Sequence, residues 1–252
     1  MEYYIGTAGF MIGKKSWMQL NVLNCIEINS TFYHLPNDKM VSSWREYPEN
    51  IKISIKVSKY ITHTKRLKDV ESYWTTFWER IKPCENKIIS ILFQLPPSFT
   101  YSEVNLNRIL AIKQYFPTNM NMVIEFRNKS WLSQYVYQKL ESSGIIICGT
   151  YIQRGPRTTN WLGDMPNGAN FGNVFDKIGY IRIHGMKGYK GELSQEQLVE
   201  LYKKIKISNT KQQIIIFNNT FFKDRNQMVL INNIQIKYAA IHNAVSMKLV
   251  TG

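Results

Sequence analysis

The sequence predicts a (β/α)8 barrel, a single α/β domain in which parallel strands alternate with outer helices. Eight short apolar runs, each long enough for one strand, are spread along the chain with helix-length gaps between them. Most of these runs end in a residue that can bind a ligand or take part in chemistry. The carboxyl ends of the strands share one face in this fold, and that face carries the active site. The sequence therefore locates a site before it indicates a reaction.

The strands are expected at residues 3–5, 25–28, 51–57, 88–93, 122–124, 145–147, 178–183 and 214–217. Polar or small residues stand at or just after their ends. In chain order these are Gly6, Thr7, Gly9, Glu27, Asn29, Lys56, Gln94, Glu125, Arg127, Cys148, Arg182, His184, Asn218 and Asn219.

Helical periodicity and capping signals predict the intervening helices. They are expected at 70–81 after the cap Asp69, at 103–116 after the cap Ser102, at 131–141 before the stop signal Gly144, at 195–205 after a capping box that opens at Ser194, and at 225–236. The Gly- and Pro-rich segment 153–176 breaks the alternation after the sixth strand. Such a long loop indicates either a lid or binding loop, or a tolerated surface insertion.

Length and composition indicate one intracellular domain. The 252 residues suit one barrel, and we expect a single domain over 1–252, since neither a linker nor a repeat interrupts the sequence. No apolar run approaches the roughly 18 residues that cross a bilayer, and the first residues do not resemble a signal peptide. The three cysteines lack CxxC spacing, and Cys25 and Cys148, which lie in strand-like runs, are expected to be reduced core thiols. A cytoplasmic protein without a membrane partner is expected, and its oligomeric state is not indicated.

The formal net charge of +14 favours an anionic partner, either a phosphorylated small molecule or nucleic acid. Base composition is an alternative source of this charge, because the chain is rich in Asn, Ile, Lys and Tyr, whose codons are A/T-rich. The stretch 203–206 lies on an expected amphipathic helix and predicts a solvated face.

The chain resembles domain-of-unknown-function family 72, the YecE-like proteins, in segments that follow family order from residue 5 to residue 219. The matching segments are 5–10, 27–33, 56–57, 60–63 with 66–67, 93–99, 125–127 with 130–131, 182–185 and 217–219. The resemblance implies a TIM-barrel fold and brings no established activity. Family members are distantly similar to barrels of the endonuclease-IV and xylose-isomerase type, an analogy that has suggested DNA binding or metal-dependent chemistry. Members often carry Asp at the end of the sixth strand, where this chain has Cys148, so an acidic ligand or base is missing.

Glu27 and Glu125 are the candidate general acid and base, since a carboxylate inside the upper barrel needs charged partners and has a shifted pKa. The partners we expect are Lys56, Arg127, Arg182 and His184. The alternative interpretation is a structural ion-pair network.

His184 and His63 are the histidines expected near the site, with His34 as a third. Together with the two glutamates they have ligand types that suit a divalent metal, but their spacing matches no metal motif. We therefore expect no metal and assign these histidines to substrate orientation or proton transfer, with His184 as a second proton carrier. The chain contains no GxGxxG or Walker sequence, so no nucleotide cofactor is indicated.

The strand ends predict a cationic, hydrogen-bonding pocket that suits phosphate or carboxylate oxygens. Its expected substrate-binding residues are Asn29, Lys56, His63, Gln94, Arg127, Arg182, Asn218 and Asn219. The turn that follows Gln94 contains either a cis proline bond or an ordinary rigid turn. A rim of aromatic and basic side chains suits nucleic acid, unless these are plain surface loops: Tyr60, His63, Lys65, Arg66, Trp161, Lys187, Tyr189 and Lys190.

The leading hypothesis is an enzyme that acts on an anionic, phosphate-bearing substrate by general acid-base chemistry, with Glu27, Glu125 and His184 as catalytic residues. A non-catalytic nucleic-acid-binding protein is the alternative, and a metal-dependent hydrolase or nuclease is a third possibility.

Overall fold

The computed structural model describes residues 1–151, 178–184, 191–206, 210–218, 222, 224 and 227–251. The chain divides into two compact units, one made of Met1–Glu27 with Cys148–Gly252 and the other of Ile28–Ile147. The predicted loop 153–176, the rim residues Trp161, Lys187, Tyr189 and Lys190, and the predicted site residue Asn219 lie outside the described residues.

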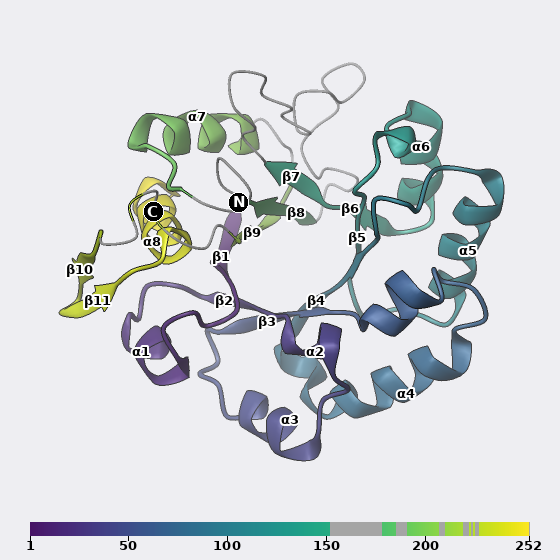
Figure 1. Cartoon of the computed structure of the whole chain (residues 1–252), viewed down its shortest axis with the longest axis horizontal. Coiled ribbons are helices and arrows are strands. Elements are labelled where there is room, and N and C mark those ends of the chain that lie inside the picture. The colour runs from purple at the N-terminus through teal and green to yellow at the C-terminus, as the bar shows by residue number, and fades with distance from the viewer. Residues whose placement is uncertain are drawn as a thin grey trace. The chain divides into compact units, whose positions relative to one another are not determined.

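The Ile28–Ile147 unit contains four parallel strands in the order β3, β4, β5 and β6, with the bounds Lys52–Lys56, Ile88–Gln94, Met122–Glu125 and Ile145–Ile147. Helices α3 (Asp38–Arg45), α4 (Glu71–Ile81), α5 (Glu103–Gln114) and α6 (Gln134–Ser142) form an arc outside these strands (Figure 1). The short helix α2 (Ser30–Tyr33) and the 3-10 segments η2 (Lys82–Lys87) and η3 (Lys129–Trp131) lie in the connections.

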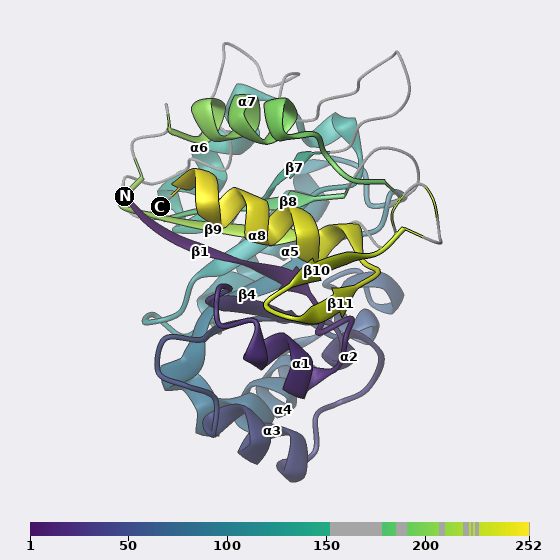
Figure 2. The ribbon, with the colours of Figure 1, turned by 90° about the vertical axis from the view of Figure 1, so that its left-hand side faces the viewer.

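The other unit contains strands β1 (Glu2–Ala8), β7 (Gly149–Tyr151), β8 (Ile178–Ile183) and β9 (Gln212–Phe217), together with most of β2 (Cys25–Ile28). These strands are parallel and pair in the order β2, β1, β9, β8, β7. Helix α8 (Ala239–Thr251) packs on β1 and β9 and contacts α7 (Gln195–Lys206), as Figure 2 shows. Helix α1 (Lys14–Gln19) follows β1.

The predicted α/β fold of the (β/α)8 type is confirmed, because parallel strands alternate with helices in both units and all eight expected strands form. Strand β7 is an addition that the sequence did not predict. Its residue Thr150 pairs with Arg182, so the segment after Cys148 continues as a second short strand.

Most predicted helix ends are confirmed. The Ser102 side chain accepts from the Asn105 amide at the start of α5. At the start of α7, the Ser194 amide donates to Gln197 Oε1, and the Gln197 amide donates back to Ser194 Oγ, which is a capping box. Gly144 has a φ of 72°, the left-handed conformation expected after a helix end.

Two helix starts differ from the prediction. Asp69 does not cap α4; it has a φ of 50°, and Val70 is the N-cap residue, without a side-chain hydrogen bond. The predicted helix at 131–141 begins three residues later, at Gln134, because Ser133 accepts from the Val136 amide and caps it there. Trp131 instead ends η3 and is completely buried.

The predicted last helix at 225–236 is wrong. Part of this segment forms an antiparallel hairpin of β10 (Val229–Ile231) and β11 (Ile234–Ile236). The β-branched residues at 229, 231, 234 and 236 favour strands, and Asn232 and Asn233 adopt the positive φ values of 48° and 63° that a tight hairpin turn needs. The last helix is α8, which lies later in the chain.

The described peptide bonds include no cis bond, so Pro96 and Pro97 form the ordinary turn rather than the cis alternative. The Phe99 amide closes this turn on the carbonyl oxygen of Pro96 at 2.9 Å.

The three cysteines are buried and form no disulfide bond. Burial raises the pKa of the Cys25 thiol, with a contribution from the charge of Glu27, and burial raises the pKa of Cys84 to about 11. The Cys25 and Cys84 thiols therefore have little thiolate character at neutral pH.

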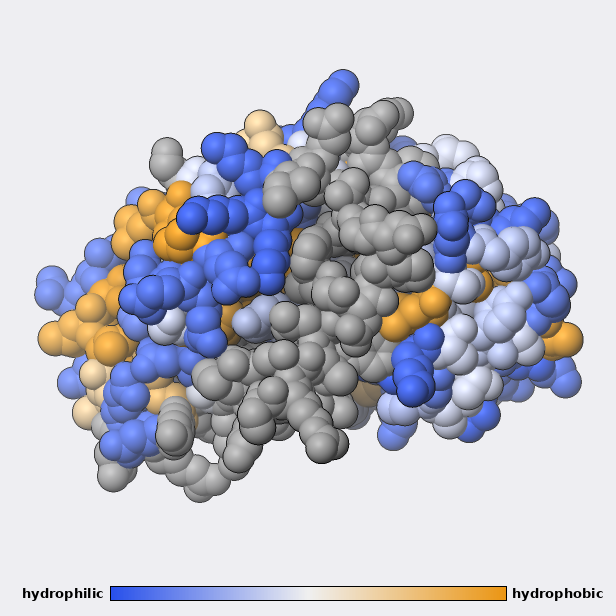
Figure 3. All heavy atoms as spheres, turned by 90° about the horizontal axis from the view of Figure 1, so that it is seen from above, coloured by the Kyte–Doolittle hydropathy of each residue, from blue (hydrophilic) through white to orange (hydrophobic). Residues whose placement is uncertain are grey.

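The described surface seen from above is mostly hydrophilic, with separate hydrophobic groups between the polar ones (Figure 3). On α7, Lys203 and Lys206 are exposed while Leu201 and Ile205 are buried, which confirms the solvated face predicted for this stretch. None of the described helices has the length and apolar character needed to cross a membrane.

Candidate functional site

Three predicted site residues stand at the carboxyl ends of neighbouring strands in the Ile28–Ile147 unit. Lys56, Gln94 and Glu125 are the last residues of β3, β4 and β5. Gln94 is paired with Glu125 in the sheet register, and the Lys56 ammonium donates to Gln94 Oε1 at 2.8 Å. The strand ends therefore gather these side chains as the sequence predicted for this part of the chain.

Glu125 and Arg127 form an ion pair, with 2.5 Å between Glu125 Oε1 and Arg127 Nη2. The carboxylate is completely buried, whereas 14% of the arginine side chain is exposed. The spacing of two residues predicted that both side chains project to the same side, and the pair fits that prediction. Arg127 thus stabilises a buried carboxylate while part of its own side chain stays accessible.

The segment after β3 has an unusual backbone. Residues Tyr60–Thr64 form η1, a single turn of π-helix, which is rare and often found at functional sites. Arg66 and Leu67 follow with positive φ values of 51° and 60°. Non-glycine residues adopt such values at a cost, so the surrounding contacts must hold this segment in place.

His63 lies on this π-helical turn and packs edge-on against the ring of Phe32 in α2, with centroids 5.0 Å apart. The Lys56 ammonium lies 4.0 Å from the centroid of the same Phe32 ring. The ring therefore links the histidine to the lysine at the end of β3, and the lysine gains a cation–π contact.

The imidazole of His63 is neutral at physiological pH. Partial burial, followed in order by the positive charges of Lys56, Lys59 and Arg127, lowers its pKa from 6.5 to about 4. Three cations from two segments of this unit therefore create a positive potential where the imidazole lies.

Asn29, the N-cap residue of α2, has a buried Oδ1 that accepts no hydrogen bond from a described residue.

Glu27, Tyr180 and Arg182 form a second cluster, in the other unit. Glu27 Oε1 lies 2.7 Å from Arg182 Nη2, and the Tyr180 hydroxyl donates to Glu27 Oε2 at 2.8 Å. The side chains of Glu27 and Arg182 are 0% and 1% exposed, so this ion pair is closed to solvent. Both carboxylate oxygens of Glu27 thus have a partner.

His184 is completely buried just after β8, and its Nδ1 lies 3.2 Å from Asn218 Nδ2. The His184 amide donates to the Tyr151 carbonyl, and the Asn218 amide donates to the Ile183 carbonyl. Near Glu27, Gly6 must remain glycine, because an added Cβ would lie 1.6 Å from the Cys25 carbonyl oxygen. Backbone contacts therefore fix both strand ends.

The sequence reasoning missed several residues that contact the predicted ones. Tyr180 had a usable signal, because it precedes Arg182 and His184 at the two-residue spacing that puts side chains on the same side of a strand. Phe32 and Thr62 have ordinary sequence surroundings, and their contacts with His63 are seen only in the folded chain.

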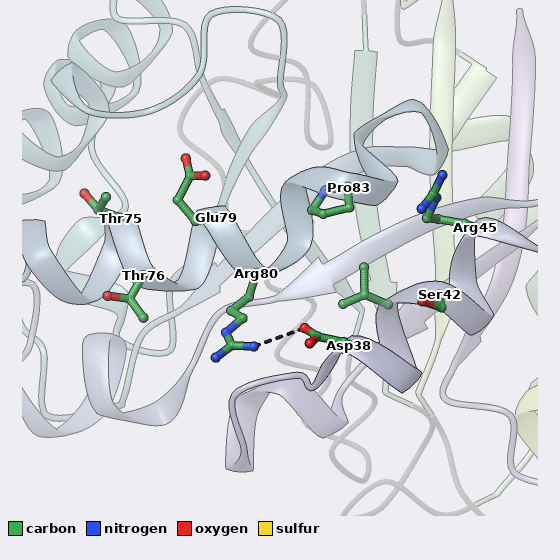
Figure 4. A pocket seen from close by; sticks show the side chains of 9 residues that line it. Asp38, Ser42, Arg45, Thr75, Thr76, Glu79, Arg80 and Pro83 are labelled. Atoms are coloured by element: carbon green, nitrogen blue, oxygen red, sulfur yellow. Dashed lines mark hydrogen bonds and ion pairs between the residues drawn. The ribbon is translucent and has the colours of Figure 1, made fainter.

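A groove of about 610 Å³ lies between α3 and α4 (Figure 4). Its lining includes Asp38 and Arg80, which pair with each other at 3.1 Å and are both well exposed. Its lining residues come from the outer helices and from Pro83, so none of the predicted strand-end residues contributes to it. We therefore do not assign the chemistry to this groove.

Within the described ranges, no three His, Cys, Asp or Glu side chains gather into a group that could hold a metal ion. The metal-dependent hypothesis stays a prediction that these residues do not support.

These features define a class: a (β/α)8-type α/β protein with charged residues at the carboxyl ends of its parallel strands. The chain belongs to the family described as protein of unknown function DUF72, whose model matches residues 19–249. This match confirms the family that the sequence motifs predicted.

Two curated relatives match part of the chain. A 112-residue segment is 28% identical to UPF0759 protein YecE of Escherichia coli (strain K12), covering 44% of this chain and 40% of that protein. A 121-residue segment is 26% identical to UPF0759 protein YunF of Bacillus subtilis (strain 168), covering 45% of this chain and 43% of that protein. The matched segments thus span less than half the length of these relatives.

Solved structures extend the likeness over the whole chain. A DUF72 family protein from Thermotoga maritima MSB8 has a TM-score of 0.77 at 22% identity and covers 100% of this chain and 99% of its own. A DUF72 family protein from Enterococcus faecalis V583 has a TM-score of 0.77 at 19% identity, covering 99% and 97%. At such identities the likeness shows a shared fold.

Proposed function

We propose that this chain is an enzyme that binds an anionic, phosphate-bearing small molecule at the strand ends of the Ile28–Ile147 unit and acts on it by acid-base chemistry. Lys56 and Arg127 bind the anion, Gln94 and His63 contact the ligand, and Glu125 is the candidate acid or base. The observation that carries this proposal is the set of cations around His63: Lys56 and Lys59 come from the end of β3 and the start of η1, and Arg127 comes from the segment after β5.

Charge and geometry support an anion at this point. A guanidinium carries five N–H donors, so Arg127 can bond to Glu125 and to a ligand oxygen at the same time. Lys56 adds a charged donor, and hydrogen bonds to charged groups contribute about 1.5–3 kcal/mol each. A ligand with two or more anionic oxygens suits this pair of donors better than a neutral one.

The acid-base role of Glu125 rests on its position next to the cations. An anion that binds Arg127 also comes close to the Glu125 carboxylate, because the two side chains are in direct contact. A carboxylate beside the bound ligand is placed to give a proton to it or to take one from it.

The predicted site residues of the other unit receive no role in this proposal. Glu27, Arg182, His184 and Asn218 stay predictions, and so does Asn219. The contacts of Glu27 favour a structural role, because both carboxylate oxygens are engaged within a closed pair.

The test is calorimetric titration of the full chain with inorganic phosphate, comparing the wild type with Lys56→Met and Lys52→Met. Both lysines lie on β3 at opposite ends, so Lys52→Met is the matched control for net charge. We expect Lys56→Met to weaken phosphate binding by on the order of tenfold to a hundredfold, the value of one charged hydrogen bond. Wild type that does not bind phosphate, or equal effects of both substitutions, would overturn the proposal.

A second function, binding of single-stranded nucleic acid, is favoured by one observation. Tyr60 and Tyr73 are exposed and in ring contact, with centroids 4.5 Å apart, and the Lys65 ammonium lies 5.9 Å from each ring centroid. A pocket of about 360 Å³ that these tyrosines help to line opens beside them. Exposed aromatic rings beside a cation suit base stacking with phosphate neutralisation.

The two functions separate by their salt dependence. Oligonucleotide binding should weaken steeply between low and physiological salt and should be lost in a Tyr60→Ala, Tyr73→Ala double variant. Phosphate binding at the strand ends should survive that double variant. Retained oligonucleotide affinity in the double variant would remove the second function.

A further inference from the structure

We propose that His63 is the proton acceptor of this site, that Nε2 is the accepting atom, and that Thr62 positions the imidazole for this role. The inference rests on the proposed anion site and adds a catalytic residue to it. The sequence predicted substrate orientation or proton transfer for His63 and indicated no role for Thr62.

The hydrogen bonds of Thr62 fix which imidazole nitrogen carries the proton. The Thr62 hydroxyl donates to the Ser58 carbonyl oxygen at 3.1 Å, and it lies 2.9 Å from His63 Nδ1. A hydroxyl has one proton. Thr62 uses it in the hydrogen bond to Ser58, because a carbonyl oxygen can only accept a hydrogen bond. The contact with His63 therefore requires Nδ1–H to donate to Thr62 Oγ1, and Nε2 keeps a lone pair.

The π-helical turn holds this arrangement in place. Ser58 and Thr62 are joined twice, because the Thr62 amide also donates to the Ser58 carbonyl oxygen, at 3.2 Å. Thr62 is completely buried, whereas His63 is partly exposed and rests against Phe32. Among the described residues none forms a hydrogen bond with Nε2. The imidazole is thus fixed at Nδ1 while its basic nitrogen remains available.

The charges around His63 change when an anion binds. The groups that face the imidazole are Lys56 from β3, Lys59 from the start of the π-helical turn, and Arg127 from the segment after β5, where Arg127 also pairs with Glu125. An anion beside Lys56 and Arg127 offsets their charge and raises the pKa of His63 from about 4 towards its ordinary value of 6.5. A base with a pKa near the working pH is the most effective one.

The proton transfer balances within the site. Nε2 forms a bond to the proton of a ligand O–H or C–H group, the bonding electrons stay on the ligand, and His63 becomes an imidazolium. The ligand gains one negative charge, which Lys56 and Arg127 face. The same proton returns from Nε2 to the product in the second half of the reaction.

Binding and protonation are linked, and the sign follows from the pKa change. When a bound anion raises the pKa of His63, the protein takes up a proton on binding. The affinity for the anion therefore rises as the pH falls. If the pKa moves from about 4 to about 6.5, sulfate should bind on the order of thirtyfold more tightly at pH 5.0 than at pH 7.5. Sulfate is the suitable probe because it does not itself titrate in this range.

The first experiment is nitrogen NMR of His63 in the full chain at pH 7, without ligand. We expect the Nδ1–H tautomer in the wild type, a shift towards the Nε2–H tautomer in Thr62→Val, and recovery in Thr62→Ser, which restores the hydroxyl. A residue with a purely structural role would not move the tautomer. A wild-type Nε2–H tautomer would contradict the inference, whatever the ligand.

The second experiment is calorimetric titration with sulfate at pH 5.5 in two buffers of different ionisation enthalpy, which counts the protons taken up. We expect close to one proton per sulfate in the wild type and almost none in His63→Gln, with His34→Gln as the matched control that keeps the uptake. Sulfate binding without proton uptake would overturn the role of His63 and leave the anion site intact. Failure of sulfate to bind at all would overturn the proposed function, and this inference with it.

Discussion

Each unit of the chain contains one glutamate–arginine pair at its strand ends, and the two pairs differ in accessibility. Glu27 and Arg182 are 0% and 1% exposed, and the Tyr180 hydroxyl occupies the second carboxylate oxygen. Glu125 is equally buried, but Arg127 is 14% exposed and acts on His63 together with two lysines. The same two residue types therefore form a closed pair in one unit and an accessible cationic group in the other.

This difference separates a structural pair from a ligand site. The side chains of the closed pair are shielded from solvent, so a ligand from solution does not reach their charges. A pair with an accessible arginine and neighbouring cations still has donors that an anion can meet.

Replacing Arg182 by Met should give the largest loss of stability. The substitution leaves Glu27 buried without its cation, which costs about 3–5 kcal/mol of the free energy of unfolding. Urea unfolding followed by circular dichroism measures it. The matched control is Arg80→Met, which breaks the exposed pair with Asp38 and should cost less than about 1 kcal/mol. Equal losses of unfolding free energy in both variants would show that the Glu27–Arg182 pair is no more closed to solvent than the surface pair.

Replacing Tyr180 by Phe should have an intermediate effect. It removes the hydroxyl from Glu27 Oε2 and keeps the ring, so the buried oxygen loses its donor at a cost of about 1–3 kcal/mol. The same unfolding measurement applies. A double-mutant cycle with Arg182→Met should show coupling between the two substitutions, since both act on one carboxylate. Strict additivity would argue against a single cluster.

Replacing Arg127 by Lys should weaken sulfate binding about fivefold, or about 1 kcal/mol, because the charge remains while the two-pronged donor is lost. Titration calorimetry at constant salt measures this. Arg108→Lys, on α5 in the same unit, is the control and should leave the affinity unchanged. An Arg127→Lys variant with wild-type affinity would mean that the guanidinium does not contact the anion.

The smallest expected effect is on the titration of His63. Lys59 is exposed, and its charge lowers the pKa of His63 less than the charge of Lys56 does. Lys59→Met should raise that pKa slightly, and added salt should reduce the difference because exposed charges are screened. NMR titration of the imidazole measures both. A pKa that falls after the substitution would contradict the assignment of the positive potential.

The strands and the strand-end residues were predictable because both depend on local pattern. Runs such as 88–93 and 178–183 are apolar enough to be strands in any parallel sheet, and their ends place Gln94 and Arg182 without further information. The hairpin at 229–236 was missed because its apolar spacing also fits a helix, and the left-handed turn at Asn232 and Asn233 decides between them.

The contacts within the candidate site were only partly predictable. Spacing by two residues predicted that Glu125 and Arg127 share a side, and the same rule applied to β8 would have found Tyr180. The tautomer of His63 depends on the π-helical turn that brings the Thr62 hydroxyl to the Ser58 carbonyl oxygen. No periodic pattern encodes that turn, so the orientation of this histidine required the three-dimensional structure.

A sulfate titration of the full chain, followed through side-chain NMR signals, distinguishes the accessible pair from the closed one. We expect the His63 imidazole and Arg127 guanidinium signals to move together and saturate at one affinity, while the Arg182 guanidinium signal stays in place. A saturable change at Arg182 with no change at His63 and Arg127 would contradict this expectation.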